Sequence, residues 1–419
     1  MTTVKDDAEV AIIGGGAAGI AAARRLHEAG IDCLLIEARE RLGGRGFSTA
    51  LPDGTMLDLG CGWLHSADRN PWSRIARGQG RTIDKSPPPW TKPSLEVGFP
   101  LDQQRDFLQA LNAFYERLEA LARQDADAPA AAALEAGSRW NALIGAVGTY
   151  ISGGELDRVS ARDFNNYADT EVNWRVVEGY GTLIAAHAEG VPVALGCPVH
   201  RIDHSGRRLR IETARGTITA DKAIVTLPTS VMAAMDDLFA PALPEKIEAA
   251  HNLPLGLDDK LFIALEGAEE FEPDSRLFGR TDRATAAYHL RPFGRPMIEA
   301  YFGGQLAAEL EAGGPAAFYD FAVAELTALL GSAFAARIKP IVVHPWGADP
   351  YARGAYSFAL VGKAHCRQVL AAPVDNRLFF AGEACSEPDF STAHGAYRTG
   401  IAAAEQFLAA RPRMKVVTG

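Results

Sequence analysis

A glycine-rich turn near the start of the 419-residue chain has the spacing of a phosphate-binding loop. In the segment IIGGGAAG, Gly14, Gly16 and Gly19 form the pattern GxGxxG between two apolar runs. One glycine permits the tight turn, one lets the backbone approach a pyrophosphate, and one lets a helix pack on a strand. Glu37 ends the second apolar run, where a carboxylate would accept hydrogen bonds from ribose hydroxyls and disfavour a 2′-phosphate. The pattern predicts a dinucleotide site, and a purely structural glycine turn is the alternative.

Two arginines and a glycine pair follow Glu37 in the segment ARERLGGRG. Arg39 and Arg45 stand on either side of a turn that contains Gly44. Guanidinium groups bind phosphate oxygens through paired hydrogen bonds. The segment therefore indicates a second contact with the pyrophosphate of the same ligand, and a charged surface loop is the alternative.

A lysine leads an apolar run in the segment PLGLDDKLFIAL. Lys260 is followed directly by five apolar residues, a pattern typical of a buried strand. Burial would lower the pKa of this lysine, and a neighbouring carboxylate such as Asp258 or Asp259 would restore it. The residues alone leave open whether Lys260 is buried or is a surface lysine at a strand end.

The periodicity of apolar residues around these candidates predicts alternating strands and helices. Residues 9–13 and 33–38 are expected to be short buried strands, with an amphipathic helix at 17–30 between them. The closing segment again predicts strand, turn and helix, so both ends of the chain indicate one βα architecture that insertions divide. Between them the sequence predicts a proline-rich connection at 81–100, a long helix at 102–124, a hairpin turning near Arg215, and a helix across 315–331.

Composition places the chain among globular proteins and narrows its partners. Hydrophobic residues make up 47% and charged residues 22%, and the length indicates two domains. The net charge of −10 argues against nucleic acid or an anionic membrane as the main partner. The five cysteines form no CxxC pair, and the first residues lack the basic and apolar regions of a signal peptide. A cytoplasmic protein with reduced thiols and without a membrane-spanning helix is expected.

Several motifs, in order along the chain, resemble the flavin-containing amine oxidase family. They are IIGGGAAG with EARERLGGR, then LDLGCGWLHSADRNP, AIVTLPTSVM, LFFAGEACS and STAHGAYRTG. In that family the long GGR extension belongs to FAD and not to NAD. The segment LDLGCGWLHSADRNP is most similar to the polyamine oxidase branch. The resemblance therefore implies FAD as the cofactor.

The resemblance also implies which further residues contact FAD. Gly62 and Trp63 match positions that face the cofactor, and Val199 matches a position where the backbone meets the adenine. Gly382 and Glu383 match residues near the ribityl-phosphate region. The N–H groups around Ala393 would face the pyrimidine end of the flavin ring, where a positive helix end would stabilise the anionic reduced form.

On the substrate side, Lys260 matches a lysine that holds a water beside the flavin. His65 matches a histidine near the substrate, with a hydrogen-bonded loop histidine as the alternative. Tyr356 matches one ring of an aromatic pair that encloses the amine, and Thr392 stands in place of the other ring. Trp346 is a further aromatic candidate, and a core position is the alternative for both aromatic residues.

The fold that the resemblance implies is a two-domain α/β FAD-binding fold with an inserted substrate-binding domain. The Rossmann-like FAD-binding domain is expected to comprise residues 1–80, 172–248 and 350–419. The α+β substrate-binding domain is expected to comprise residues 81–171 and 249–349. Ala355 stands where monoamine oxidases carry a cysteine that tethers FAD, so noncovalent FAD is expected.

The activity implied is that of an FAD-dependent amine oxidase. A primary or secondary amine, a polyamine among them, would be oxidised to an imine while dioxygen is reduced to hydrogen peroxide. An L-amino-acid oxidase is an alternative that needs an arginine for the carboxylate, with Arg69, Arg74 and Arg291 as candidates. A second alternative is a flavin dehydrogenase or desaturase that passes its electrons to an acceptor other than oxygen. A third is an FAD-binding scaffold without enzyme activity, or an enzyme that acts on methylated lysine within a protein. The expected partners are a small amine and dioxygen, without nucleic acid or membrane, in a monomer or homodimer.

Overall fold

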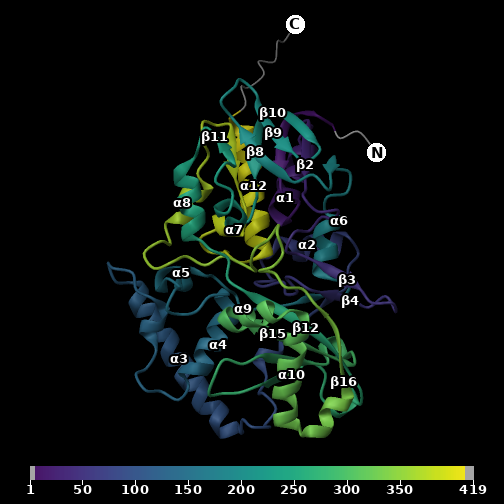
Figure 1. The fold of residues 1–419 in the computed structure, drawn as a ribbon, viewed down its shortest axis with the longest axis vertical. Helices are drawn as coiled ribbons and strands as arrows, with labels where there is room; N and C mark the ends of the chain where they lie inside the picture. Colours follow the sequence, from purple (N-terminus) through teal and green to yellow (C-terminus); the bar gives the residue numbers. More distant parts are fainter. Residues whose placement is uncertain (1–4, 411–419) are drawn as a thin grey trace.

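The computed structural model describes residues 5–410, which form two halves that follow one another along the long axis (Figure 1). The upper half contains both ends of the described chain, with α1 (Ala17–Glu28) and α12 (Ala393–Ala409). The lower half contains β12 (Asp258–Leu265) and the long helices α3 (Leu101–Ala122) and α10 (Pro315–Leu330).

The upper half is built on an eight-stranded sheet. Its strand order is β11-β8-β9-β10-β1-β2-β7, and β17 also pairs with β10. Strand β10 is parallel to β1 and β17 and antiparallel to β9. Three separated parts of the chain therefore supply one sheet. Its strands are β1 (Asp7–Ile13), β2 (Cys33–Ile36), β7 (Val193–Ala194), β8 (Val199–Asp203), β9 (Leu209–Thr213), β10 (Gly216–Val225), β11 (Phe239–Ala240) and β17 (Leu378–Phe380).

Helices cover both faces of this sheet, which explains why its central strands are apolar without alternation. On one face, Ile12 of β1 packs in a cluster with residues of α1 and α12. On the other face, Ile13 packs with residues of α7 (Thr229–Ala233), α8 (Pro244–Asn252) and α11 (Cys366–Ala371). The helices α1 and α12 approach closely because Gly400 has no side chain. A Cβ at Gly400 would lie 2.2 Å from the carbonyl oxygen of Ala18.

The lower half is built on a five-stranded antiparallel sheet in the order β13-β14-β15-β12-β16. One face packs on α9 (Gly304–Gly313) and α10 in a continuous apolar cluster, with Ile263 and Phe302 among its fully buried members. The opposite face carries polar and charged residues and turns toward a cavity. The strands besides β12 are β13 (Ser275–Phe278), β14 (Ala287–Leu290), β15 (Met297–Gly303) and β16 (Ile338–Val343).

Further helices and short strands complete both halves. Helix α3 packs through Phe107 and Phe114 on α4 (Asn141–Ser152) and α5 (Ala161–Asn166). The other helices are α2 (Pro71–Gly78) and α6 (Tyr180–Ala186), and two small ribbons are formed by β3 (Ser48–Ala50) with β4 (Met56–Asp58) and β5 (Ile83–Asp84) with β6 (Arg175–Val176). The 3₁₀ helices are η1 (Pro89–Thr91), η2 (Ala130–Ala133), η3 (Ala268–Glu270), η4 (Pro292–Gly294), η5 (Ser332–Arg337) and η6 (Glu383–Cys385).

Most elements predicted from periodicity are present with small shifts at their ends. The predicted long helices coincide with α3 and α10, and the predicted hairpin turns between the paired residues Thr213 and Gly216. One expectation changes, because Lys260 lies inside β12 and not ahead of it. The strand begins at Asp258, two residues before Lys260, so its first three residues are polar.

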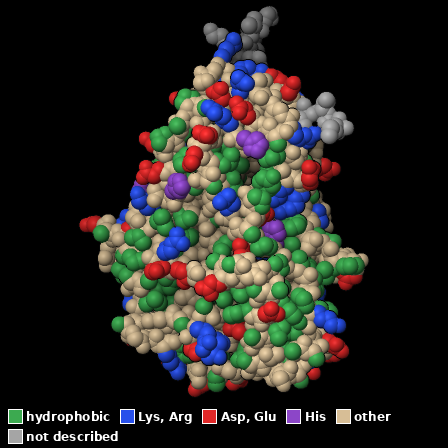
Figure 2. Space-filling view, in the orientation of Figure 1, with side chains coloured by type: hydrophobic (Ala, Val, Ile, Leu, Met, Phe, Trp, Pro, Cys, Tyr) green, Lys and Arg blue, Asp and Glu red, His purple; other side chains and the backbone are tan. Residues whose placement is uncertain are grey.

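Acidic and basic side chains are interspersed over the face of the molecule drawn in Figure 2. The net charge of −10 is therefore not gathered on that face into one acidic area. Within residues 5–410, the helices are all too short or too polar to cross a lipid bilayer.

Candidate functional site

A cavity of about 1230 Å³ lies where the two halves of the molecule meet. Its wall includes the polar face of the five-stranded sheet, the glycine loop before α1, and residues of α3. Pockets for cofactors and substrates are typically concave and largely preformed, and this one is large enough for both. All but one of the predicted site residues line it: Gly14, Gly16, Glu37, Arg39, Gly44, Arg45, Gly62, Trp63, His65, Val199, Lys260, Trp346, Tyr356, Gly382, Glu383, Thr392 and Ala393.

Two glycine loops meet at one end of the cavity. Gly14 adopts a positive φ of 110°, and a Cβ at Gly16 would find nothing nearer than the Cα of Gly44, at 3.9 Å. The N–H of Gly43 donates to the carbonyl of Gly15 at 2.8 Å and ties the two loops together. The remaining predicted residue, Gly19, packs away from the cavity, where a Cβ would clash with the Gly14 carbonyl at 1.9 Å. The loops thus leave open backbone where a pyrophosphate would lie.

The Glu37 carboxylate is buried at the rim of this loop and is already oriented by the backbone. It accepts hydrogen bonds from the N–H of Gly15 at 2.6 Å and from the N–H of Arg39 at 2.8 Å. A carboxylate has about four lone-pair sites, so capacity remains for the hydroxyls of a ribose. Its position between β2 and the glycine loop is the one that dinucleotide recognition requires.

Arg39 and Arg45 both line the cavity, and each already has a carboxylate partner. Arg39 pairs with Asp349, and Arg45 donates to Glu383 at 2.9 Å and to the carbonyl of Ala355 at 2.8 Å. The Arg45 ion pair joins a loop near the N-terminus to one near the C-terminus. Each arginine retains further N–H donors for a phosphate.

These features fit a bound FAD. The glycine cradle and the two guanidiniums supply hydrogen-bond donors for a pyrophosphate, and the carboxylate beside them supplies acceptors for the hydroxyls of a ribose. Gly382, with a φ of 148° and nothing within 4 Å of a built Cβ, offers a second stretch of open backbone. Val199 lies at the start of β8 and also lines the cavity.

Lys260 is buried on the cavity wall, with 5% of its surface exposed, which excludes the surface alternative. Its Nζ forms an ion pair with Glu299 at 3.1 Å and donates to the carbonyl of Asp58 at 3.2 Å. A Cβ built on Gly62 would lie 3.1 Å from that Nζ. Burial alone would lower the pKa of Lys260, but Glu299 and Asp58 outweigh burial and raise it. The lysine therefore stays a cation.

The carboxylate that forms the ion pair with Lys260 is Glu299, although Asp258, one of the two expected aspartates, also raises the pKa of Lys260. Asp259 points to the other side of the strand, where it accepts from the N–H of Trp346 at 3.0 Å. Asp258 shares the Lys260 face, but its Oδ1 is buried without a hydrogen-bond partner within residues 5–410. Glu299 reaches Lys260 from the neighbouring strand β15, because the register places Tyr301 opposite Lys260 and Glu299 opposite Phe262.

Glu299 begins a chain of buried charges that sequence reasoning missed. His289 lies with Nδ1 3.6 Å from Glu299 and Nε2 2.8 Å from Asp274. Asp274 in turn pairs with Arg175 at 2.8 Å. Burial opposes ionisation of Glu299, but Lys260 and His289 outweigh it and lower its pKa to about 2. A lone charge in the apolar run MIEAYFG was the signal in the sequence that could have identified Glu299.

Asp258 and Tyr356 lie together on the cavity wall near Lys260. Burial raises the pKa of Asp258 to about 7. The Tyr356 hydroxyl donates to the carbonyl of Tyr150 in α4, which orients the ring. The structure thus gives the cavity one aromatic ring at this position, and beside it a carboxylate that is costly to ionise without a cationic partner.

His65 has a defined tautomer. Asn173 donates through its Nδ2 to the Glu171 carbonyl at 3.1 Å, so its Oδ1 is left to accept from His65 Nδ1 at 2.7 Å. Burial lowers the pKa of His65, and the ring is therefore neutral near pH 7 with its lone pair on Nε2. A neutral histidine on the wall can accept a proton.

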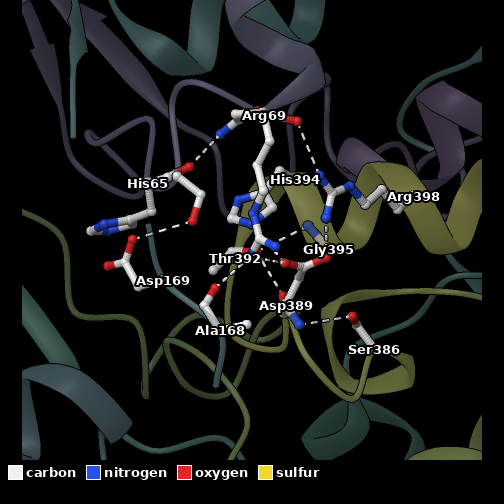
Figure 3. A network of polar contacts seen from close by, with 12 residues as sticks. His65, Arg69, Ala168, Asp169, Ser386, Asp389, Thr392, His394, Gly395 and Arg398 are labelled. Atoms are coloured by element: carbon white, nitrogen blue, oxygen red, sulfur yellow. Dashed lines mark hydrogen bonds and ion pairs between the residues drawn. The ribbon is translucent and has the colours of Figure 1, made fainter. Parts of the chain in front are cut away.

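Thr392 precedes α12 directly, and its side chain caps the N-terminus of that helix. Its hydroxyl accepts from the Gly395 N–H at 2.9 Å and donates to the Asp389 carbonyl at 2.6 Å. Figure 3 shows that Arg69 and Arg398 converge on the Asp389 carboxylate, which holds this loop against the helix. The arrangement leaves the helix N-terminus, with its positive dipole end, at the cavity wall near Ala393.

Trp346 is almost fully buried at the edge of the cavity, and its indole N–H donates to the Leu59 carbonyl at 3.0 Å. Of the three arginines considered for a carboxylate, Arg69, Arg74 and Arg291, none lines the cavity. Arg69 pairs with Asp389, and Arg291 donates to the Phe271 carbonyl at 2.7 Å.

Comparison with known proteins gives consistent matches along the chain. Residues 103–408 match the family described as flavin containing amine oxidoreductase, and residues 12–77 match an NAD(P)-binding Rossmann-like domain. The chain is 30% identical to polyamine oxidase 2 of Arabidopsis thaliana, over 94% of this chain and 87% of that protein. It is 26% identical to lysine-specific histone demethylase 2 of Homo sapiens, over 96% of this chain and 53% of that protein. A triple mutant of putrescine oxidase from a redesign of cofactor binding has a similar fold, with a TM-score of 0.77 at 18% identity over 96% of this chain and 99% of that one.

Proposed function

Because the chain belongs to the flavin containing amine oxidoreductase family and its cofactor is FAD, we propose that it oxidises a primary or secondary amine to an imine and passes the electrons to dioxygen. Bound FAD supplies the redox step, in which it accepts a hydride equivalent from the α-carbon of the amine. Water then hydrolyses the imine, and dioxygen is reduced to hydrogen peroxide. The residues of the chain bind the amine, set its protonation and exclude bulk water.

The observation that carries this proposal is the buried Lys260–Glu299 ion pair on the cavity wall. A lysine held as a cation beside Gly62, within a cavity that also has the dinucleotide cradle, is expected to bind a water molecule or an oxygen species there. Neutral His65 contributes differently, because its Nε2 can accept the proton that an ammonium must lose before it reacts. The Tyr356 ring would pack against the alkyl part of the amine.

Two experiments test the proposal. A peroxide-coupled screen over monoamines, polyamines and amino acids is expected to give peroxide with at least one amine. If the flavin is never reduced by an amine, or if the reduced flavin is stable in air, the oxidase assignment is wrong. For Lys260, the Lys260→Met variant is expected to slow flavin reduction or reoxidation in stopped-flow absorbance traces. Wild-type rates for both steps would remove Lys260 from the reaction.

A further inference from the structure

Two arginines line the cavity without an ion pair to another described residue; Arg353 is exposed to solvent, whereas Arg276 is half-buried. Arg276 lies on β13, the edge strand of the five-stranded sheet, and its side chain is on the cavity wall. Its Nε is buried without a hydrogen-bond partner, and no ion pair to Arg276 is present within residues 5–410. Its guanidinium lies over the aromatic ring of Phe278, with the Cζ 5.2 Å from the ring centroid.

The environment of Arg276 makes its charge costly. Burial lowers the pKa of Arg276 to about 10, and no nearby carboxylate counteracts it. Arginines in such positions are usually paired, because an uncompensated buried charge loses its hydration without a replacement. An anion placed at this point of the cavity would restore the lost interaction through two parallel hydrogen bonds.

The other charged side chains of the cavity wall form no ion pair with Arg276 in the described structure. Seven carboxylates also line the cavity. Glu116, Glu119, Asp169 and Glu171 are solvent-exposed, whereas Glu37, Asp258 and Glu383 are at least half-buried, and none of the seven forms an ion pair with Arg276 within the described residues. Deeper in the wall, Glu299 is engaged by Lys260, and Asp274 by Arg175 and His289. Arg276 is thus the half-buried arginine on the cavity wall that the described residues leave available for a ligand, while Arg353 is exposed to water.

The sheet register gives the separation between Arg276 and the Lys260 strand. Arg276 lies opposite His289, His289 opposite Glu299, and Glu299 opposite Phe262. Residues that are directly opposite share a face, and neighbouring strands are about 4.8 Å apart. Arg276 is therefore three strand spacings, roughly 14 Å, from the strand that carries Lys260 and Asp258 on the same face.

We propose that Arg276 binds a carboxylate of the substrate, so that the substrate is an amine with an anionic group several carbon atoms away from the reacting nitrogen. Asp258, on the same face near Tyr356, is suited to the ammonium end before deprotonation. An α-amino acid carries both groups on one carbon and is too short to reach from Arg276 to the Lys260 strand. A polyamine would place a second cation against the guanidinium. This inference rests on the proposed amine oxidation but concerns the choice of amine.

Binding of an unreactive probe tests the anion site independently of turnover. Isothermal titration of the oxidised holoenzyme with hexanoate is expected to show binding that 1-hexanol does not match. In Arg276→Met the affinity for hexanoate should fall about tenfold or more, and Arg276→Lys should recover part of it. Arg283→Met, an exposed arginine of the adjoining loop, is the matched control and should bind hexanoate as the wild type does. Equal hexanoate affinity in the wild type and Arg276→Met would overturn the proposal, and loss in the Arg283 control would show an effect of net charge only.

Isomeric amines test the distance. The kcat/KM for 6-aminohexanoate is expected to exceed that for hexylamine and for 2-aminohexanoate by about tenfold or more in the wild type. The advantage should disappear in Arg276→Met while hexylamine oxidation is retained. A preference for 2-aminohexanoate or for spermidine would overturn the proposal that the substrate carries a remote carboxylate. If no amine at all is oxidised, the proposed function fails, and the hexanoate titration still decides whether Arg276 is an anion site.

Discussion

The Lys260–Glu299 pair predicts a large and pH-dependent coupling between two side chains. The pKa of Glu299 drops from 4.5 to about 2 because Lys260 and His289 outweigh burial. At ~1.4 kcal/mol for each tenfold change in the proton affinity, this corresponds to about 3 kcal/mol of folding free energy. Because the folded-state pKa is depressed, the contribution is fully present above pH 4.5 and is lost as the pH falls toward 2.

The test is a double-mutant cycle of Glu299→Gln and Lys260→Met, measured by urea unfolding at pH 7 with saturating FAD. Each single variant leaves one buried charge without its partner and should lose about 3 kcal/mol or more. The double variant removes both charges and should recover most of that loss, so the coupling energy is about 3 kcal/mol. If the two single losses of unfolding free energy simply add in the double variant, the reasoning is refuted, because the two side chains then do not interact.

An exposed pair provides the control for this cycle. Arg280 also lowers the pKa of Asp282 to about 2, but both side chains are exposed to solvent. Water and salt screen such a pair, so the cycle of Arg280→Met and Asp282→Asn should show a much smaller coupling. A coupling as large as that of the buried pair would show that burial is not the source of the effect.

Three more outcomes follow from single features. Gly400→Ala should lower the melting temperature because its Cβ would lie 2.2 Å from the Ala18 carbonyl, whereas Gly145→Ala, in open space within a helix, should leave it equal or higher. Burial raises the pKa of Asp258 from 3.8 to about 7, so the folded state binds the proton more tightly than the unfolded state does. Stability therefore falls as the pH rises from 3.8 to about 7. Asp258→Asn should therefore melt at a higher temperature than the wild type above pH 7, with the difference closing below pH 4, and an unchanged difference across this range would contradict a buried carboxyl. With Ala355 in place of a tethering cysteine, acid precipitation should release all FAD to the supernatant, and a yellow pellet would contradict noncovalent binding.

The sequence was informative where local spacing determines structure. The glycine loop, Glu37 and the strand after Lys260 could be predicted because each depends on residues close together in the chain. Glu299, His289 and Arg276 could not, because their neighbours follow from the register of four antiparallel strands. A shift of one residue in that register would turn each of them to the apolar face against α10. The ion-pair partner of Lys260, Glu299, could not be predicted for the same reason, since it lies on another strand, although the predicted Asp258 also raises the pKa of Lys260.

The order in which a ribosome releases the chain gives the three-part sheet a further consequence. Strand β10 pairs with β1 but also with β17, and α1 is covered by α12, which ends at Ala409. Until the last part of the polypeptide has emerged, the apolar side of α1 and one edge of β10 have no cover. Such exposed surfaces are prone to aggregation during synthesis. We therefore expect the nascent protein to need protection by chaperones late in translation, and a chain that ends before residue 378 to accumulate as insoluble material even though its glycine loop is intact.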